Sequence, residues 1–298
     1  MANERHPVFF SRGATEVIVQ AFETEWTDPD GLRFYSKGWE PGGKSKAAVA
    51  LVHGLGEHVG RYAHVGQAFS DAGYALMGFD LRGHGKSAGL RGHTPSIEAF
   101  MRDIDLLLEH IRARYPALPL FLYGHSLGGI LVLNYGLRRK PDLKGVIVTS
   151  PGLHTALHEQ HAKVVLVKLL GGIAPTVLIP SELDTAMLSH NPQIEKTYRS
   201  DPLVHDKISF GFGKAMLDAT QWALQHASEF PLPLLLMHGT SDQIAFPSSS
   251  EEFAAALDQS RVKLVLWPDL YHETHNEPEQ ASVLKTSVDW MDACLKHG

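Results

Sequence analysis

One segment, Leu120-Phe-Leu-Tyr-Gly-His-Ser-Leu-Gly-Gly-Ile-Leu-Val-Leu-Asn134, carries most of the information about the fold of this 298-residue chain. Its first four residues form an uninterrupted apolar run, which is typical of a strand buried on both faces of a parallel sheet. The small-residue turn Gly124-His-Ser-Leu-Gly128 follows, and then a helix is expected over 127–139. A tight strand-to-helix turn of this kind places Ser126 at the carboxyl edge of the sheet.

Strand and helix signals alternate on both sides of this segment. Apolar runs bounded by Gly, Pro and Asp predict strands, and apolar residues at helical spacing predict helices. Alternation of this kind predicts an α/β fold, with a mostly parallel sheet that has helices on both faces. Strands are expected over 17–26, 32–39, 47–53, 74–79, 118–123, 145–149, 233–238 and 262–267, and helices over 61–72, 96–115, 127–139, 248–257 and 279–295.

The alternation is interrupted once. Between residues 152 and 225 the sequence is mostly helical in character and gives no regular strand signal. We therefore expect residues 1–151 and 226–298 to form the sheet-containing core, with 152–225 inserted as a cap.

Composition narrows the class of protein. Lys and Arg number 27 against 33 Asp and Glu, a net charge of −6, whereas nucleic-acid binders usually carry a basic excess. The single cysteine, Cys294, forms no internal disulfide, which fits a reducing compartment. The N-terminus shows no signal peptide, and the most apolar stretch, Val164–Ile179, is interrupted by Lys168 and Pro175. A soluble, cytoplasmic protein is expected, with no nucleic-acid partner; nothing is predicted about its oligomeric state.

Three residues suggest nucleophilic catalysis. A serine hydroxyl needs a neighbouring base, and the base needs an acid to orient it. Asp242 and His272 each directly follow a predicted strand, so both side chains are expected beside Ser126 at the carboxyl edge of the sheet. The chain order Ser, Asp, His is that of one class of serine hydrolases. We therefore predict a catalytic triad of Ser126, Asp242 and His272.

Two backbone amides are candidates for an oxyanion hole. The N–H of Leu127 lies at the start of the predicted helix after Ser126, where it faces an incoming carbonyl oxygen. The second donor is expected in the loop after an earlier strand, where His53-Gly-Leu-Gly56 places Leu55 between two glycines.

The motifs together resemble the monoacylglycerol lipase family of α/β-hydrolases, from about residue 23 almost to the end. The resemblance is weakest between residues 154 and 179. It rests on His53-Gly-Leu-Gly-Glu-His-Val-Gly-Arg-Tyr62, Phe79-Asp-Leu-Arg-Gly-His-Gly-Lys-Ser87, Gly124–Gly128, Tyr271-His272, and the cap segments 184–189 and 198–203.

The resemblance implies an α/β-hydrolase fold with a helical cap, and oxyanion donors at Leu55 and Leu127. It also implies that Glu57, Arg61 and His275 hold the glycerol hydroxyls of the substrate. On the residues alone, pairing of Glu57 with Arg61 is the better interpretation.

The apolar stretch 164–179 has two interpretations. Its side chains either pack the cap on the sheet domain, or form an acyl-chain tunnel whose lip makes transient contact with lipid aggregates or a membrane surface. The second interpretation makes Ile179 a substrate-binding residue and the protein peripheral to a membrane.

The function expected is hydrolysis of a small-molecule lipid ester, a monoacylglycerol, to fatty acid and glycerol through an acyl-enzyme. No cofactor and no metal are implied. The alternatives are a lysophospholipase or a general carboxylesterase or lipase and, further away, a serine peptidase or a non-catalytic binding protein of the same fold.

Overall fold

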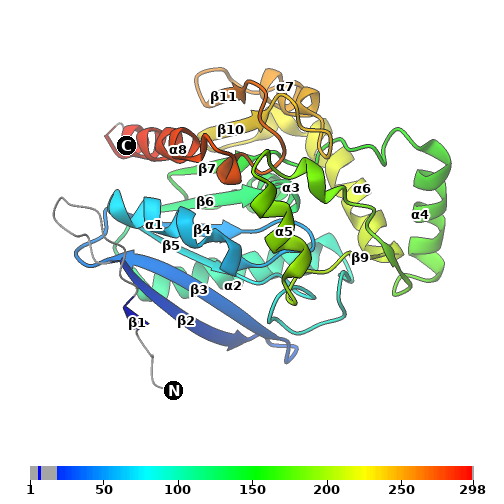
Figure 1. The fold of residues 1–298 in the computed structure, drawn as a ribbon, viewed down its shortest axis with the longest axis horizontal. Helices are drawn as coiled ribbons and strands as arrows, with labels where there is room; N and C mark the ends of the chain where they lie inside the picture. The colour runs from blue at the N-terminus through cyan, green and yellow to red at the C-terminus, as the bar shows by residue number, and fades with distance from the viewer. Residues whose placement is uncertain (1–5, 8–18, 297–298) are drawn as a thin grey trace.

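The structure is a computed structural model that describes residues 6–7 and 19–296 (Figure 1). Within them the main sheet has nine strands in the order β1-β2-β3-β5-β4-β6-β7-β10-β11. At one edge of the sheet, β1, β2, β3 and β5 pair antiparallel with one another. The remaining pairs, from β5 and β4 through β6, β7 and β10 to β11, are parallel. The strands are β1 (His6–Pro7), β2 (Val19–Thr27), β3 (Arg33–Pro41), β4 (Ala47–Val52), β5 (Tyr74–Phe79), β6 (Leu120–His125), β7 (Gly145–Thr149), β10 (Leu234–Gly239) and β11 (Val262–Trp267).

Helices cover both faces of this sheet, because its central strands are apolar on both sides. All residues of β4, β5, β6, β7 and β10 are buried. On one face the core includes side chains of α2 (Ile97–Arg114), α3 (Leu127–Arg139) and α7 (Pro247–Ala255). On the other face it includes side chains of α1 (Ala63–Asp71) and α8 (Gln280–Lys296). The predicted fold class is confirmed.

The element bounds differ from the predicted ones mainly at the ends. The strand predicted over 17–26 is β2, and residues 17–18 lie outside the described part of the chain. The helix predicted from residue 61 is a 3-10 turn, η1 (Val59–Tyr62), followed by α1.

The chain leaves the sheet after β7 and returns to it at β10. In between lie α4 (His161–Ile173), β8 (Leu178–Pro180), η2 (Thr185–Met187), α5 (Pro192–Ser200), β9 (Lys207–Ser209), α6 (Phe210–Gln225) and η3 (Ala227–Glu229). Strands β8 and β9 form a small antiparallel sheet that was not expected, because strands of three residues are too short to show an alternating pattern. Helix α4 projects furthest from the main sheet (Figure 1).

Backbone hydrogen bonds attach this inserted segment to loops at the carboxyl edge of the sheet. The His205 N–H donates to the Gly56 carbonyl (2.9 Å), and the Glu273 N–H donates to the Leu188 carbonyl (2.8 Å). No helix in the described ranges is long and apolar enough to cross a membrane.

Candidate active site

A strained turn between β6 and α3 presents Ser126. Its backbone has a positive φ of 53°, and its N–H donates to the Thr149 carbonyl (3.0 Å). The two glycines of the turn are required sterically. A Cβ on Gly124 would lie 2.4 Å from the Gly128 carbonyl oxygen, and one on Gly128 would lie 2.0 Å from the Val52 carbonyl oxygen. The close approach of α3 to β4 and β6 therefore fixes the position of Ser126.

The structure brings Ser126, His272 and Asp242 together, as the sequence predicts. His272 Nε2 lies 2.9 Å from Ser126 Oγ, and His272 Nδ1 lies 2.7 Å from Asp242 Oδ2. With a proton on Nδ1 for the carboxylate, Nε2 is free to accept the serine proton. Asp242 follows β10 and His272 follows β11, and these adjacent parallel strands place both loops at one edge of the sheet.

The surroundings shift the pKa values of Asp242 and His272 in opposite directions. Burial raises the pKa of Asp242, but the adjacent His272 and hydrogen bonds from His238 and His272 outweigh burial and hold it well below its usual range. Burial lowers the pKa of His272, but the Asp242 carboxylate outweighs that effect and leaves it above its ordinary value. The carboxylate is thus ionised wherever the imidazole titrates.

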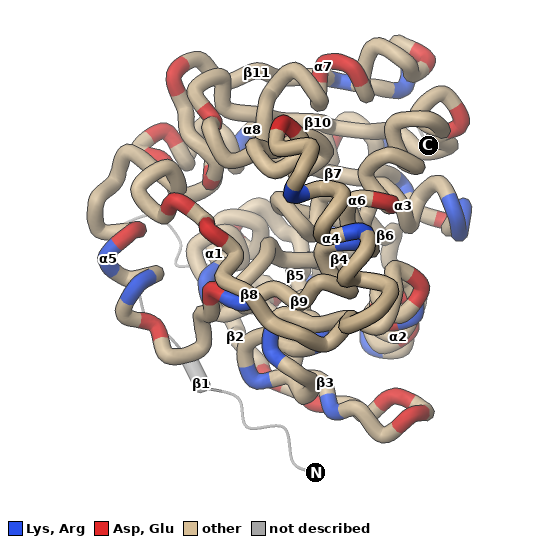
Figure 2. Tube along the Cα trace, turned by 90° about the vertical axis from the view of Figure 1, so that its right-hand side faces the viewer, with Lys and Arg blue, Asp and Glu red and all other residues tan. Residues whose placement is uncertain are grey.

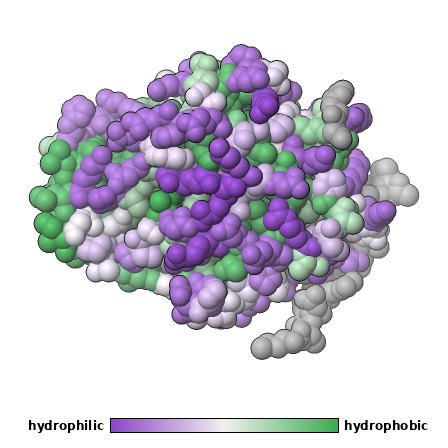
Figure 3. Space-filling view, turned by 180° about the vertical axis from the view of Figure 1, so that it is seen from behind, coloured by the Kyte–Doolittle hydropathy of each residue, from purple (hydrophilic) through white to green (hydrophobic). Residues whose placement is uncertain are grey.

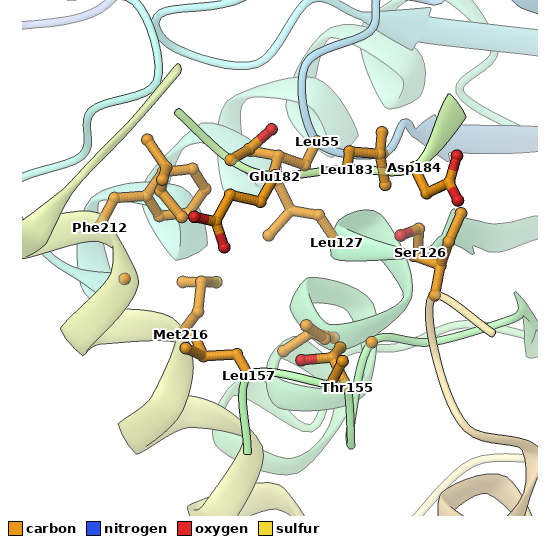
Figure 4. Close-up of a pocket in the computed structure, with 18 of the residues that line it drawn as sticks. Leu55, Ser126, Leu127, Thr155, Leu157, Glu182, Leu183, Asp184, Phe212 and Met216 are labelled. Carbon is orange, nitrogen blue, oxygen red and sulfur yellow. The ribbon is translucent and has the colours of Figure 1, made fainter. Parts of the chain in front are cut away.

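Leu55 and Leu127, the predicted oxyanion donors, line the same cavity as Ser126. Leu127 is the first residue of α3, so its N–H has no acceptor within the helix. Leu55 lies in the loop after β4, between Gly54 and Gly56. Within the described residues neither amide donates to a protein acceptor. Both residues line the cavity into which Ser126 points (Figure 4).

This cavity has a volume of about 700 Å³ and lies between the sheet domain and the inserted segment. Ser126 lies at one end of the view in Figure 4, and Phe212 and Met216, both from α6, lie at the other. Much of the lining is apolar, which suits an aliphatic chain. The apolar lining includes Leu157, Leu166, Val167, Ile179, Leu183, Met187, Leu188, Phe212, Met216 and Leu217.

A cluster of charged side chains forms one wall of the same cavity. Glu57 and Glu273 both line it, and Arg61 bridges them. Arg61 Nη1 donates to Glu57 Oε2 (2.7 Å) and to Glu273 Oε1 (2.6 Å), and Nη2 donates to Glu273 Oε2 (2.8 Å). Glu57 Oε1 accepts from the Gly54 N–H (2.6 Å) and the Tyr62 hydroxyl (2.7 Å).

The two carboxylates differ in their pKa values. Burial raises the pKa of Glu57, and the Arg61 charge opposes the shift without cancelling it. Burial also acts to raise the pKa of Glu273, but the bidentate contact with Arg61 outweighs burial and lowers it to about 2. Glu273 is therefore the firmly ionised partner of Arg61.

The predicted substrate-binding residues fall into two groups. Glu57 and Ile179 line the cavity, whereas Arg61 and His275 are not among its lining residues. His275 lies in η4 (Thr274–Asn276) and is buried, with its ring stacked on Tyr62 at 5.0 Å between centroids. Among the described residues its Nδ1 has no hydrogen-bond partner.

Sequence reasoning missed two residues of the site. Glu273 directly follows His272, so a carboxylate beside the predicted base was a signal in the sequence. His238 lies on β10 four residues before Asp242 and donates from Nε2 to Asp242 Oδ2 (3.0 Å). Nothing in a single sequence separates this histidine from an ordinary buried one.

The fold and the Ser126–His272–Asp242 arrangement define a serine hydrolase of the α/β-hydrolase class. A family model described as serine aminopeptidase, S33, matches residues 43–279. The chain belongs to this family and, within it, to the monoacylglycerol lipase family, which confirms the resemblance seen in the sequence. The expected enzyme class, a carboxylic-ester hydrolase, follows from this membership.

Three proteins show the extent of the similarity to this chain. Monoacylglycerol lipase of Mycolicibacterium smegmatis is 33% identical over 262 residues, which are 88% of this chain and 93% of that protein. The crystal structure of Paleococcus ferrophilus monoacylglycerol lipase superimposes with a TM-score of 0.80 at 36% identity, covering 89% of this chain and 99% of that one. A protein of Dictyostelium discoideum named as an uncharacterized abhydrolase domain-containing protein is 39% identical over 255 residues, and the chain spans 27% of its length.

Proposed function

We propose that this protein hydrolyses monoacylglycerols to fatty acid and glycerol through an acyl-enzyme. The observation that carries the proposal is that Ser126 lines a cavity of about 700 Å³ whose lining is largely apolar and also includes the carboxylates of Glu57 and Glu273. A substrate with one aliphatic chain and one polyol fits these two environments. Two of the relatives described above are named as monoacylglycerol lipases, which supports the same substrate class.

In the proposed mechanism, Ser126 Oγ attacks the ester carbonyl while His272 Nε2 takes the serine proton. Asp242 holds the Nδ1–H tautomer of His272 and stabilises the imidazolium that forms. The Leu55 and Leu127 amides stabilise the oxyanion of the tetrahedral intermediate. His272 then protonates the departing glycerol oxygen, and in the second half-reaction it activates the water that cleaves the acyl-enzyme.

The inserted segment 152–225 is proposed as the cap that covers the acyl chain. It supplies Ile179, Leu183 and Met187 to the cavity wall. An aliphatic tail that is covered in this way gains about 0.8 kcal/mol for each buried CH₂ group relative to water.

We place the glycerol end of the substrate against Glu57 and Glu273. These carboxylates contact the hydroxyls in this arrangement, since polyol hydroxyls donate to carboxylate oxygens. Arg61 holds both carboxylates in place, and His275 supports Tyr62, which itself donates to Glu57. Arg61 and His275 thus support the glycerol site without contacting the substrate.

Relative rates on a substrate panel test the proposed substrate. The panel compares a monoacylglycerol, a lysophospholipid, a nitrophenyl ester of equal acyl length and an aminoacyl amide. The highest kcat/KM is expected for the monoacylglycerol. A higher value for the lysophospholipid would make the protein a lysophospholipase, and a higher value for the amide would make it a peptidase.

We further propose that α4 contacts a lipid surface. Val165, Leu169 and Ile173 are 66%, 57% and 72% exposed, and the patch that they form with Leu166 and Val177 is green in the view from behind (Figure 3). Leu166 and its neighbour Val167 also line the cavity, so the patch is continuous with the proposed acyl site.

The charges around α4 are compatible with contact between this helix and a lipid surface. Lys163 pairs with Glu182 (2.7 Å) and Lys168 with Asp218 (3.6 Å), and both signs are interspersed on this side of the molecule (Figure 2). An apolar patch without an excess of one charge is suited to the hydrocarbon–headgroup boundary rather than to an anionic surface alone.

Co-sedimentation with phosphatidylcholine vesicles tests the contact. Replacing Leu169 and Ile173 together by Asp should lower the bound fraction at least about fivefold, because two charges then enter the lipid boundary. Leu90→Asp is the matched control, since Leu90 is 45% exposed and lies outside α4. Equal binding of the double variant and the control would exclude α4 as the contact surface.

A further inference from the structure

Two imidazoles converge on one carboxylate oxygen at the acidic end of the proposed triad. Asp242 Oδ2 accepts from His272 Nδ1 (2.7 Å) and from His238 Nε2 (3.0 Å). Asp242 Oδ1 accepts the backbone N–H groups of Ile244 (2.8 Å) and Ala245 (3.0 Å). The side chains of Asp242 and His238 are both completely buried.

The neighbours of His238 determine its tautomer. Nε2 faces two acceptors, Asp242 Oδ2 and the Ala245 carbonyl at 3.0 Å, and therefore carries a proton. Nδ1 lies 2.7 Å from Ser250 Oγ, whose hydroxyl satisfies it in the neutral ring. His238 is thus held as a hydrogen-bond donor to Asp242 Oδ2, the same oxygen that accepts the hydrogen bond from His272 Nδ1.

The position of His238 makes it more than a packing residue. It lies near the end of β10, and its Nε2 spans the loop that carries Asp242 by bonding both that side chain and the Ala245 carbonyl. Sharing one oxygen between two donors weakens the negative charge that stabilises the imidazolium of His272.

We propose that His238 is a positioning residue that acts through Asp242, fixing the carboxylate and lowering the basicity of His272. The inference rests on the proposed function, since it assigns the roles of Asp242 and His272. Without the His238 donor, Asp242 would interact more strongly with His272 and hold it less precisely in line with Ser126. The acid limb of the activity profile would move to higher pH, and kcat would fall.

The test is the pH dependence of kcat/KM on a nitrophenyl ester. His238→Phe removes both ring nitrogens, and the acid-limb pKa should rise by about half a unit or more. We expect kcat to fall about 5- to 50-fold, with KM within about twofold, because the ring makes no contact with substrate. His238→Gln retains a terminal N–H donor and should restore a profile close to wild type.

Two controls separate a positioning role from a general loss of structure. His226→Phe removes an imidazole whose Nδ1 bonds the Trp222 carbonyl, and its acid limb should stay unshifted. If His238→Phe does not fold, His238→Asn takes its place, because the shorter amide does not reach Asp242. A shift in the Asn variant and none in the Gln variant supports the proposal.

An unshifted acid limb in a folded variant that lacks the donor at position 238 would overturn the proposed role of His238. A second readout is independent of turnover: the low-field ¹H resonance of the His272–Asp242 hydrogen bond, titrated in wild type and variants. A wild-type protein without esterase activity would refute the proposed function, whereas an unchanged NMR titration in His238→Phe or its Asn substitute would refute the role of His238.

Discussion

Arg61 binds Glu273 through two parallel hydrogen bonds of 2.6 and 2.8 Å, and Glu273 is the residue immediately after His272. The same guanidinium contacts Glu57, whose other oxygen accepts the N–H of Gly54 in the loop that carries Leu55. Arg61 therefore links the loop of the proposed oxyanion hole to the loop of the proposed general base. Substitutions in this cluster are expected to affect stability and substrate selectivity differently.

Arg61→Ala should destabilise the fold. Its side chain is 11% exposed, and those of Glu57 and Glu273 are 3% exposed, so removal of the cation leaves two buried carboxylates unpaired. Loss of one partner from a buried ion pair costs about 3–5 kcal/mol. Urea unfolding measures the loss. Arg33→Ala, which removes an exposed pair with Glu25, should cost less than about 1 kcal/mol. Similar losses in both variants would show that the cluster is not a buried network.

Glu57→Gln should reduce activity on the glycerol ester selectively. The substitution replaces one carboxyl oxygen by an amide NH₂ group, so a glycerol hydroxyl that donates there loses its acceptor. Such a loss in a buried site costs roughly 1–3 kcal/mol, or about 5- to 150-fold in kcat/KM. The measurement is the ratio of kcat/KM for a monoacylglycerol to that for a nitrophenyl ester of equal acyl length. His275→Ala is expected to lower this ratio less than Glu57→Gln does, because His275 is not part of the cavity wall and reaches Glu57 only through Tyr62. Equal losses on both esters in Glu57→Gln would mean that Glu57 only supports the oxyanion loop.

Ile179→Trp should shorten the acyl chains that the protein prefers. Ile179 lines the cavity, and a bulkier ring there displaces the end of a long chain. Excluding two CH₂ groups from burial costs about 1.6 kcal/mol, or about 15-fold in kcat/KM, while short esters are unaffected. The profile of kcat/KM against acyl length measures the change. Ile173→Trp, at a position that is 72% exposed on α4, is the control. Identical profiles in the two variants would place the acyl chain elsewhere.

Acid should destabilise the protein below the ordinary histidine pKa of 6.5. Burial lowers the pKa of His53 and of His125 to about 3, and that of His205 to about 4. Between those values and 6.5 the unfolded chain binds more protons, so stability falls as the pH falls, with a limiting slope of about 1.4 kcal/mol per pH unit for each histidine. The contribution of His272 to the pH dependence of stability has the opposite sign. Its pKa is raised in the folded protein, so the stability that it contributes is lost as the pH rises.

Thermal unfolding between pH 7.5 and 4.5 tests the balance of these contributions. The Tm should fall steadily below pH 6.5. A constant or rising Tm over this range would contradict the assignment of these histidines as buried and neutral.

The sequence predicts most of the fold because the elements that form it carry strong local patterns. The continuous apolar runs of β4 to β7 and the glycines around Ser126 leave few other arrangements, and chain order alone was enough to select Asp242 and His272. Their roles, with those of Leu55 and Leu127, stay predictions that the geometry supports.

Other parts of the site depend on contacts that no local pattern encodes. Arg61 turns to Glu273, which is distant in sequence, and the 3-10 turn after His272 directs His275 toward Tyr62 rather than the cavity. The pairing of β8 with β9 is likewise fixed by the way the inserted segment folds back on itself.

Turnover of a monoacylglycerol by Ser126→Ala tests the central claim most directly. The variant removes only the hydroxyl that lies 2.9 Å from His272 Nε2, so it should fold as wild type does. Activity should fall about 10⁴-fold or more, because the acyl-enzyme can no longer form. A folded Ser126→Ala protein that retains a tenth of wild-type activity would contradict the assignment of Ser126 as the nucleophile, and with it the mechanism proposed here.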